Sequence, residues 1–371
     1  MSSTNVKEKS LARQISRSGL TLWMLLLSAC DPCHTGFDDI EEAVLFQAQD
    51  VVEVEDPGEQ IHVMTWNIKF GGGRISFFWE CDGERSIMKE EEVLANMELV
   101  AEKINQAQPD ILLIQEIEAN SKRAAYMDQV QWLLDKTYFN YAAYASQWKA
   151  DFVPSDGIGK INSGSAVLSR WPFAGAQRIA LPLIGDHDPV TRYFYLKRNV
   201  LTAKLQWEGR VLHVVNTHTS AFSKDGTKRK QLLRFKEVLD GIAAQNEVFV
   251  AGGDLNSLPS SSPKRRGFAD ECDDAKFKGD DYTGQDAWLD ELYNDYTPAV
   301  SLVDFATDPA PHYTFTGDEN ISWNRKLDYL FTNGAWVDGT TLTHQDMDSG
   351  GLSTIERSDH APLSVVLDFG L

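Results

Sequence analysis

The chain has few basic residues for its length. It carries 35 Lys and Arg against 55 Asp and Glu, which gives a formal net charge of −20 over 371 residues. Such a surface keeps a protein soluble and repels polyanions at long range. This charge weighs against a protein that holds nucleic acid through many phosphate contacts. It does not exclude an enzyme that contacts a phosphate at one cleft.

Cysteine is also scarce, with four residues in the chain. The cysteines are scattered and the sequence has no HExxH pattern, so we do not expect a zinc site. Cys81 and Cys272 lie in the body of the chain, and an oxidising compartment would allow them to form a disulfide. The sequence allows two free thiols equally well.

The apolar stretch near the N-terminus, residues 20–27, is too short to span a bilayer. It follows a basic segment and leads to "LSAC", which ends at Cys30. This arrangement resembles the lipobox of bacterial lipoproteins, in which the chain is cut before the cysteine and the cysteine is lipidated. The resemblance implies a signal peptide over residues 1–29 and an exported protein, anchored to the bacterial cell envelope on its periplasmic side or at the cell surface. The alternative is an ordinary secretory signal that is cut near Ala29.

The rest of the chain divides by composition. Residues 30–60 are acidic and show no sustained pattern, so we expect a tether. Strands and helices alternate over residues 61–371, without an internal repeat, and predict one layered α/β domain. Residues 260–311 interrupt the alternation because they are rich in Ser, Asp and Gly, and we expect an insertion there. The segment 89–108 has an apolar helical stripe that Pro109 terminates.

Polar side chains recur where apolar strands end. Burying one unpaired amide or carboxylate costs about 2 kcal/mol or more, and each of them alone has an ordinary explanation as a turn residue or a paired histidine. Occurring at six separate segments, they are more simply explained if the groups meet one another or an ion. The residues are Asn67, Glu116, Asn216, His218, Asp254, Asn256, Asp328, Asp359 and His360.

This set predicts the chemistry of a phosphate-ester hydrolase. Carboxylate and amide oxygens are the ligands that Mg²⁺, Mn²⁺ or Ca²⁺ prefer. Asp328 and Asp359 are each placed to orient a histidine, and an oriented imidazole is a general base near neutral pH. A divalent ion, a water and a histidine base together can cleave a phosphate ester.

The ordered motifs resemble the endonuclease/exonuclease/phosphatase superfamily, which includes pancreatic-type deoxyribonucleases and neutral sphingomyelinases. The motifs run over residues 60–371 as "TWNI", "QEIE", "SGSAVLSRWP", "KRNVLTAKL", "NTHTS", "GGDLNSLP", "KLDYLF" and "SDHAPL". The resemblance implies an α/β (α+β) fold, a four-layer α/β/β/α sandwich in which helices flank two packed mixed β-sheets. It implies that residues 61–371 are the catalytic domain.

The resemblance also implies a role for each site residue. Glu116, Asn67 and Asp359 would hold or orient the metal, Mg²⁺ or Mn²⁺, and its water. Asp254 would position or activate the attacking water, and Asn256 and Arg198 would contact the phosphate. His360, paired with Asp328, would act as base or transition-state stabiliser, and His218 would contact the phosphate or assist the leaving group.

The chain departs from the family pattern at two places. A family tyrosine that contacts the phosphate has no clear match, and Asn162 or Tyr144 could fill its space. A long loop after the first motif carries aromatic residues at 77–79, which could touch lipid, stack on a base or simply pack under the loop. A bridge between Cys81 and Cys272 would pin this loop to the insertion.

The expected function is therefore hydrolysis of a phosphate ester, most simply a phosphodiester, by a membrane-anchored monomer. Nucleic acid, a phospholipid or sphingomyelin headgroup and a small phosphate ester all remain open as substrates. The alternative from another class is a surface-binding lipoprotein without catalysis.

Overall fold

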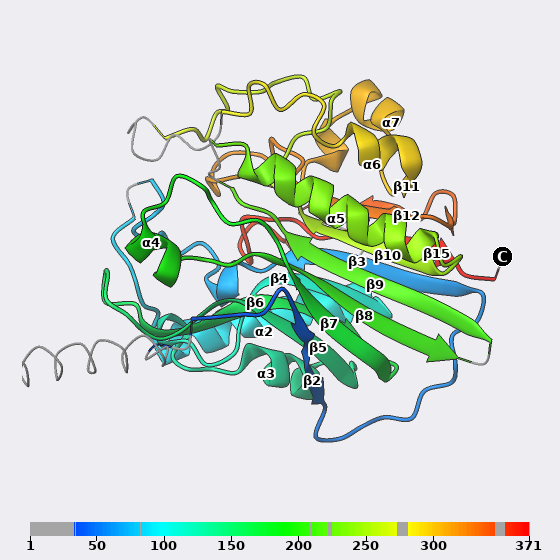
Figure 1. Cartoon of the computed structure of the whole chain (residues 1–371), viewed down its shortest axis with the longest axis horizontal. Coiled ribbons are helices and arrows are strands. Elements are labelled where there is room, and N and C mark those ends of the chain that lie inside the picture. Colours follow the sequence, from blue (N-terminus) through cyan, green and yellow to red (C-terminus); the bar gives the residue numbers. More distant parts are fainter. Residues whose placement is uncertain are drawn as a thin grey trace, which may run out of the picture.

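The structure is a computed structural model that describes Cys33 and residues 35–81, 83–207, 209–221, 225–272, 281–345 and 353–370 (Figure 1). The expected signal peptide, residues 1–29, and the expected lipidation site, Cys30, lie outside the described residues. No helix in these ranges combines the length and the apolar character that a membrane span needs.

Two mixed sheets form the centre of the fold, as expected. In the described residues, the first sheet has seven strands in the order β1-β7-β8-β9-β10-β12-β11. Their bounds are β1 Ile40–Glu42, β7 Phe173–Ala180, β8 Asn199–Trp207, β9 Arg210–His218, β10 Val248–Asp254, β12 Asp328–Thr332 and β11 Thr297–Pro298. Strands β9 and β10 are parallel, and the other neighbouring pairs are antiparallel.

The second sheet has eight strands, of which seven follow the order β13-β15-β3-β4-β6-β5-β2, and β14 pairs with β15 beside this path. Their bounds are β13 Ala335–Trp336, β15 Leu363–Asp368, β3 Gln60–Asn67, β4 Ile111–Glu118, β6 Gly159–Ser169, β5 Tyr141–Val153, β2 Val44–Gln47 and β14 Leu342–Thr343. Strands β3 and β4 run parallel, so their carboxyl ends meet at one edge.

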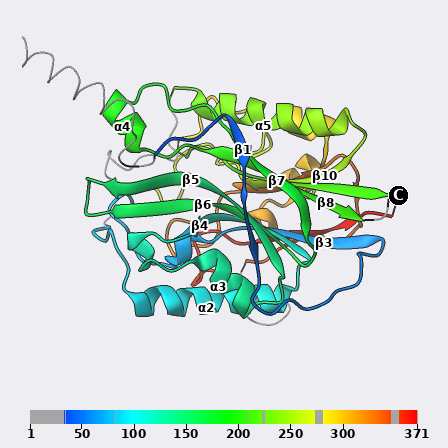
Figure 2. The ribbon, with the colours of Figure 1, turned by 60° about the horizontal axis from the view of Figure 1, so that its bottom comes forward.

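Helices cover the outer face of each sheet (Figure 2). The α-helices of the described residues are α2 Glu90–Ala107, α3 Gln129–Lys136, α4 Pro189–Phe194, α5 Thr227–Ala243, α6 Asp290–Asp295 and α7 Leu302–Thr307. Short 3₁₀ turns lie at Lys69–Gly71, Lys122–Ala124 and Ala310–His312. Helices α2 and α3 pack on the second sheet and α5 on the first, which gives the expected four layers.

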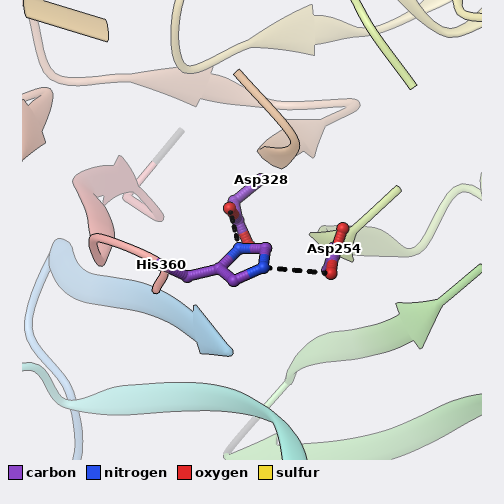
Figure 3. A group of neighbouring side chains, drawn as sticks. All are labelled: Asp254, Asp328 and His360. Carbon is purple, nitrogen blue, oxygen red and sulfur yellow. Dashed lines mark hydrogen bonds and ion pairs between the residues drawn. The ribbon is translucent and has the colours of Figure 1, made fainter. Parts of the chain in front are cut away.

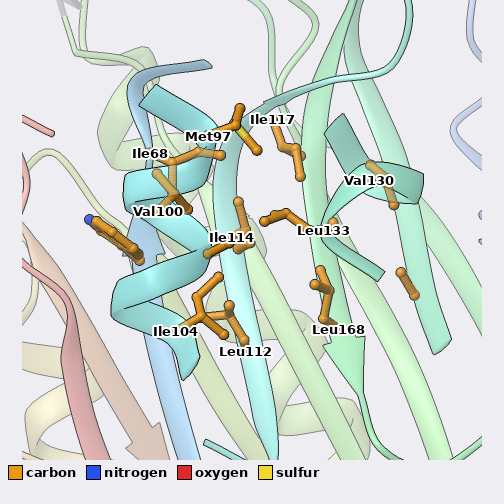
Figure 4. Close-up of a cluster of buried hydrophobic side chains, with 14 of the residues drawn as sticks. Ile68, Met97, Val100, Ile104, Leu112, Ile114, Ile117, Val130, Leu133 and Leu168 are labelled. Carbon is orange, nitrogen blue, oxygen red and sulfur yellow. The ribbon is translucent and has the colours of Figure 1, made fainter. Parts of the chain in front are cut away.

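Helix α2 follows from its sequence. Its apolar stripe repeats at helical spacing and is buried against the second sheet (Figure 4). Three acidic residues in the first turn favour the positive end of the helix dipole. The helix ends where Gln108 adopts a left-handed conformation just before Pro109. The stripe consists of Val93, Met97, Val100, Ala101 and Ile104.

The two sheets pack face to face through an apolar core that contains Leu113, Val167, Val214, Val250 and Val365. These side chains come from the inner faces of both sheets, and all of them are buried. Because the core fixes how the sheets lie on each other, it also fixes which strand ends face one another at the edge of the sandwich.

Part of the segment expected as a tether, residues 30–60, is paired with the sheets. Strand β1 pairs with β7, and β2 pairs with β5, so each adds to the edge of a different sheet. Both strands leave most of their side chains exposed to water, including apolar Ile40 at 55% and Val44 at 54%. Backbone pairing with an existing edge does not require a buried face, so the sequence pattern did not reveal it.

A disulfide joins the insertion at 260–311 to the loop after β3. The segment contains helices α6 and α7 and the two-residue strand β11. Cys81 and Cys272 form the bridge that the sequence left open, with an S–S distance of 2.11 Å. Asp270 also lies against Arg325, at 2.6 Å, and both side chains are fully buried.

Removing the disulfide tests how far it stabilises the fold. We expect the double substitution Cys81→Ser/Cys272→Ser to lower the free energy of unfolding by about 2–5 kcal/mol, because the bridge closes a very long loop in the unfolded chain. Urea denaturation followed by tryptophan fluorescence measures this change. Cys33→Ser, which removes a thiol outside the bridge, is the control, and equal stabilities of all three proteins would contradict the prediction.

Candidate active site

The expected site residues converge at one edge of the sandwich. Asn67, Glu116, His218 and Asp254 lie at the carboxyl ends of β3, β4, β9 and β10. In the first sheet, Asp254 stands opposite both His218 and Asp328. The edge therefore brings together residues that lie far apart in the sequence.

The glycine pair before Asp254 lets neighbouring backbones approach it closely. A Cβ atom on Gly252 would lie 1.9 Å from the carbonyl oxygen of Tyr329, and one on Gly253 would lie 2.0 Å from that of Thr217. Gly253 also has a φ of 124°, which side chains rarely adopt. These positions require glycine because any side chain would push the strands of the first sheet apart.

Glu116 reaches the site because strand β4 is irregular there. The pairing of β4 with β6 shifts register between Gln115 and Ile117, and Glu116 has a φ of 55°. A bulge of this kind interrupts the alternation of side chains and re-aims one of them. The carboxylate of Glu116 is 27% exposed, and its Oε1 lies 3.3 Å from Asn67 Nδ2 and 3.9 Å from His218 Nε2.

The carboxylate of Asp254 faces His360, which lies between Asp254 and Asp328 (Figure 3). Its Oδ2 accepts a hydrogen bond from Asn67 Nδ2 at 3.0 Å and lies 3.2 Å from His218 Nε2 and 3.6 Å from His360 Nε2. Its Oδ1 accepts a hydrogen bond from the backbone N–H of Asn256 at 2.9 Å. Asp254 is 1% exposed, and burial raises its pKa to about 7, although His360 opposes the shift.

His360 is held between two carboxylates. Its Nδ1 lies 2.8 Å from Asp328 Oδ2, while Nε2 faces Asp254. Burial by itself lowers the pKa of His360, but the charges of Asp328 and Asp254 outweigh it and raise the pKa to about 10. The imidazole is therefore protonated and cationic at neutral pH in the metal-free protein.

Backbone contacts fix the position of this pair. Thr314 Oγ1 accepts hydrogen bonds from the backbone N–H groups of Leu327, at 3.0 Å, and Asp328, at 3.1 Å. Trp66 Nε1 donates to the carbonyl oxygen of His360 at 2.9 Å, and the ring of Phe315 packs edge-on against the imidazole. These contacts leave the Asp328–His360 pair little freedom to reorient.

The donor atoms of this edge suit a hard divalent cation. One atom each of Asp254, Asp328 and His360 lies within 4.8 Å of the other two, close enough to hold a metal ion. Asp328 Oδ1 is buried without a hydrogen-bond partner in the described part of the chain. Glu116 adds a half-buried carboxylate beside Asn67. Oxygen ligands predominate, as Mg²⁺ and Mn²⁺ require.

The side-chain amide of Asn67, expected as an oxygen ligand, makes hydrogen bonds through both of its polar atoms. Its Oδ1 accepts a hydrogen bond from the backbone N–H of Lys69 at 3.0 Å, and its Nδ2 turns toward Glu116 and Asp254. The short turn that follows β3 supplies that N–H, so the amide in this structure orients the two carboxylates as a hydrogen-bond donor.

Ser358 connects Asp359 to Asn67. Its Oγ donates to the carbonyl oxygen of Asn67 at 2.8 Å and lies 3.2 Å from Asp359 Oδ1. Burial alone would raise the pKa of Asp359, but nearby positive charges, with Lys69 first, hold it below its usual value. Lys69 Nζ is 3.9 Å from Asp359 Oδ2 and 2.6 Å from Glu80 Oε1. Asp359 is therefore ionised and close to the cluster.

Two further expected residues supply positive or neutral polar groups. Arg198 donates to Gln147 Oε1 at 3.0 Å. Burial lowers the pKa of Arg198 below its usual value, and the charges of Glu116 and Asp254 oppose this shift only in part. Burial and the charge of Arg198 hold the pKa of His218 well below its usual value. The Nδ1 of neutral His218 is buried without a hydrogen-bond partner among the described residues.

Asp254 and Asn256 do not share one face of an extended strand. Strand β10 ends at Asp254, and Asn256 has a φ of 46°, so the chain has left the extended conformation. Asn256 Nδ2 donates to the carbonyl oxygen of Thr219 at 3.1 Å, whereas its backbone N–H holds Asp254. The local geometry is thus the turn that this motif also allowed.

The aromatic residues at 77–79 mostly pack under their loop, which is one of the alternatives that the sequence allowed. Phe77 is fully buried and stacks on Trp79, and Phe78 contacts Trp79 edge-on. Tyr144 donates to Asn162 Oδ1 at 3.1 Å, and Tyr144 is 1% exposed. These contacts account for all five side chains without a ligand.

Sequence reasoning missed the polar contact that joins the two sheets. Gln115 Nε2 donates to Asn216 Oδ1 at 2.7 Å and to Thr65 Oγ1 at 3.0 Å. Asn216 Nδ2 in turn donates to the carbonyl oxygens of Ile114 and Ala166, both at 2.8 Å. The signal in the sequence was Gln115 itself, a polar residue inside the run "ILLIQEI".

Comparisons with known proteins agree with this architecture. A sequence profile of the endonuclease/exonuclease/phosphatase family matches residues 64–360, most of the chain. No curated protein matches the chain in a sequence search.

Solved structures with the same fold include three bacterial proteins. An endonuclease/exonuclease/phosphatase from Beutenbergia cavernae is 20% identical, with 84% of this chain and 72% of that chain covered and a TM-score of 0.53. A family protein from Leptotrichia buccalis is 14% identical, with coverages of 83% and 99% and a TM-score of 0.50. A functionally unknown conserved protein from Enterococcus faecalis is 17% identical, with coverages of 82% and 98% and a TM-score of 0.50. At these identities, the likenesses show the fold alone.

The buried charges at this edge make the stability of the metal-free protein depend on pH. The folded-state pKa values of Asp254, about 7, and His360, about 10, both exceed the unfolded values, so the folded state binds protons more tightly. The stability that protonation of Asp254 adds to the folded state is complete only below its ordinary pKa of 3.8. This stability disappears as the pH rises through about 7. The stability that protonation of His360 adds is complete below 6.5 and disappears as the pH rises through about 10.

We therefore expect the free energy of unfolding, measured by urea denaturation with a chelator present, to fall between pH 6 and pH 10. Asp328→Asn removes the charge that holds the proton on His360, so we expect its decline to be smaller by about 1–3 kcal/mol. Asp338→Asn changes an exposed carboxylate and is the control. Parallel curves for all three proteins would contradict the prediction.

Proposed function

We propose that this chain, which belongs to the endonuclease/exonuclease/phosphatase family, hydrolyses phosphate esters with the help of a divalent metal ion, and that its substrate is a phosphodiester. One observation carries the proposal. The buried carboxylate of Asp254 faces Asn67, His218 and His360, which come from three other segments of the fold. A merely structural role would not require so many polar groups at the open edge of a sandwich.

Glu116 and Asp359 are the residues that we propose hold the metal. Asn67 Nδ2 donates to Glu116, and Ser358 links Asp359 to the backbone carbonyl of Asn67; both acids offer ionisable oxygen ligands. Mg²⁺ or Mn²⁺ supplies charge that neutralises phosphate oxygens and polarises a water. Asn67 keeps Glu116 and Asp254 in place through its amide N–H groups.

Asp254 and His360 divide the proton chemistry. Asp254 accepts the proton of the attacking water, because burial gives its carboxylate a pKa near neutrality. His360 is kept protonated by Asp328 and stabilises the negative charge that develops on the phosphate. Neutral His218 directs Nε2 to Asp254, and Arg198 supplies a second positive charge to the phosphate.

We also propose that the protein is exported and anchored by a lipid on Cys30. The N-terminal sequence supports this, with a basic segment, the apolar residues 20–27 and the motif "LSAC" in the order of a bacterial lipoprotein signal. The disulfide between Cys81 and Cys272 supports it independently, because such bridges persist in oxidising compartments.

Substitutions at the cluster test catalysis. We expect Glu116→Gln and His360→Gln each to lower kcat on bis(p-nitrophenyl) phosphate by about 2–4 orders of magnitude, because each removes a charge that the transition state needs. Glu237→Gln and His62→Gln, which lie on α5 and early in β3, are matched controls and should leave the rate unchanged. Wild-type rates in both cluster variants would instead favour the non-catalytic lipoprotein.

A second measurement locates the metal. We expect a chelator to abolish activity and added Mg²⁺ to restore it. Anomalous scattering from Mn²⁺-soaked crystals should place the ion beside Glu116. An ion that binds only among Asp254, Asp328 and His360 would assign it to that triad and contradict the division of roles proposed here.

Mass spectrometry of the membrane-extracted protein tests the anchor. We expect a chain that begins at Cys30 and carries the mass of acyl groups. Cys30→Ser should remain unprocessed when expressed in a host with lipoprotein maturation, while Cys33→Ser should be processed normally. A mature chain that begins near Ala29 without lipid would establish an ordinary secretory signal.

A further inference from the structure

The described chain begins at the same end of the molecule as the candidate active site. Strand β1 is antiparallel to β7, so the residues before Ile40 run out past the end of β7 that leads to this edge. Cys33 lies beyond it, and its carbonyl oxygen accepts a hydrogen bond from the backbone N–H of Asp151 at 2.8 Å. Asp151 belongs to β5, close to the tip of the β5–β6 hairpin.

Two segments frame the active-site edge here, the tip of the β5–β6 hairpin and residues 181–195, which include α4. Trp148 Nε1 in the hairpin donates to the carbonyl oxygen of Phe194 at the end of α4, at 2.6 Å. Figures 1 and 2 both place α4 and the hairpin at the end of the molecule away from the C-terminus. We call these two segments the rim.

The rim exposes large apolar side chains. Phe152 in the hairpin is 59% exposed, and Val190 in α4 and Leu183 before it are 67% and 41% exposed. Single exposed apolar residues are common in soluble proteins. These three are not isolated, because they lie on two neighbouring segments that border the edge of the candidate active site. Together they can enter the apolar layer of a bilayer.

The length of the chain before Cys33 limits where an anchor can lie. Cys30 precedes Cys33 by three residues, which span at most about 11 Å when fully extended. Because the backbone of Cys33 is hydrogen-bonded to that of Asp151, acyl chains on Cys30 would enter a bilayer close beside the rim. A longer tether would not restrict how the protein is oriented on the bilayer, whereas these three residues keep the anchor near the rim.

We propose that the rim formed by Phe152, Leu183 and Val190 docks on a phospholipid bilayer, so that the catalytic edge faces the headgroup layer. The inference rests on the proposed function through the lipid on Cys30. It assigns the substrate to phosphate esters that lie at the membrane surface. The net charge of −20 disfavours anionic lipids, so the surface that fits is a zwitterionic one.

Hydrogen exchange of the lipidated protein, with its whole mature chain, tests the docking. The protein is bound to phosphatidylcholine vesicles in one sample and held in neutral detergent micelles in the other. We expect amide exchange in residues 149–160 and 183–194 to be about tenfold slower on vesicles. Exchange in residues 49–54 and 300–307, which carry the exposed Val52 and Val303, should not change.

Matched variants separate the rim from the anchor. Phe152→Ser/Val190→Ser removes two exposed apolar side chains from the rim, and Val52→Ser/Val303→Ser removes two, 61% and 73% exposed, from other surfaces. We expect the vesicle-dependent protection to be lost in the first variant and kept in the second. Both should hydrolyse soluble bis(p-nitrophenyl) phosphate at the wild-type rate, since neither pair touches the cluster.

The outcomes distinguish the two proposals. Protection over the control segments, or none over the rim, would overturn the docking surface even if the enzyme is active. A chain without lipid on Cys30 would overturn it as well. Rim protection in a protein that does not cleave the soluble ester would support the docking surface and contradict the proposed hydrolase.

Discussion

The buried carboxylate of Asp254 is the constraint on which the active-site edge depends. It belongs to the first sheet, and the amide that holds it, Asn67, belongs to the second. An unpaired carboxylate at this depth would carry a large desolvation cost. Its contacts with Asn67, His218 and His360 offset that cost only while the two sheets keep their relative position.

The sheets are held in that position by an apolar core and by one polar contact within it. Gln115 and Asn216 are both fully buried and join the second sheet to the first. Buried amides tolerate few arrangements because each needs its partners, so this contact fixes the register of the sheets more tightly than apolar packing does. The glycine pair before Asp254 serves the same end within the first sheet.

Outside this rigid centre, loops shape the approach to the edge. The loop after β3 carries Glu80, which holds Lys69 near Asp359, and the bridge from Cys81 fixes that loop to the insertion. The insertion in turn holds Arg325 through Asp270, and Arg325 stacks on Phe315, the ring that packs against His360. Covalent and ionic contacts thus connect two surface segments to residues of the cluster around Asp254.

The sequence determined the class of fold and most members of the site, because both depend on local patterns. Helical spacing predicted α2, apolar runs predicted the buried strands, and polar residues at strand ends identified Asp254, Asp328 and His360. The order of the motifs then indicated the family.

The tertiary structure decided what those residues do to one another. The bulge at Glu116, the hydrogen bond from the Asn67 amide to Asp254 and the left-handed Asn256 were decided by the way the segments pack. The edge strands β1 and β2 are also visible only in the fold, because backbone pairing with a sheet leaves no pattern in the side chains. A sequence records the periodicity of each segment, whereas the angles and distances at a site depend on how the segments pack.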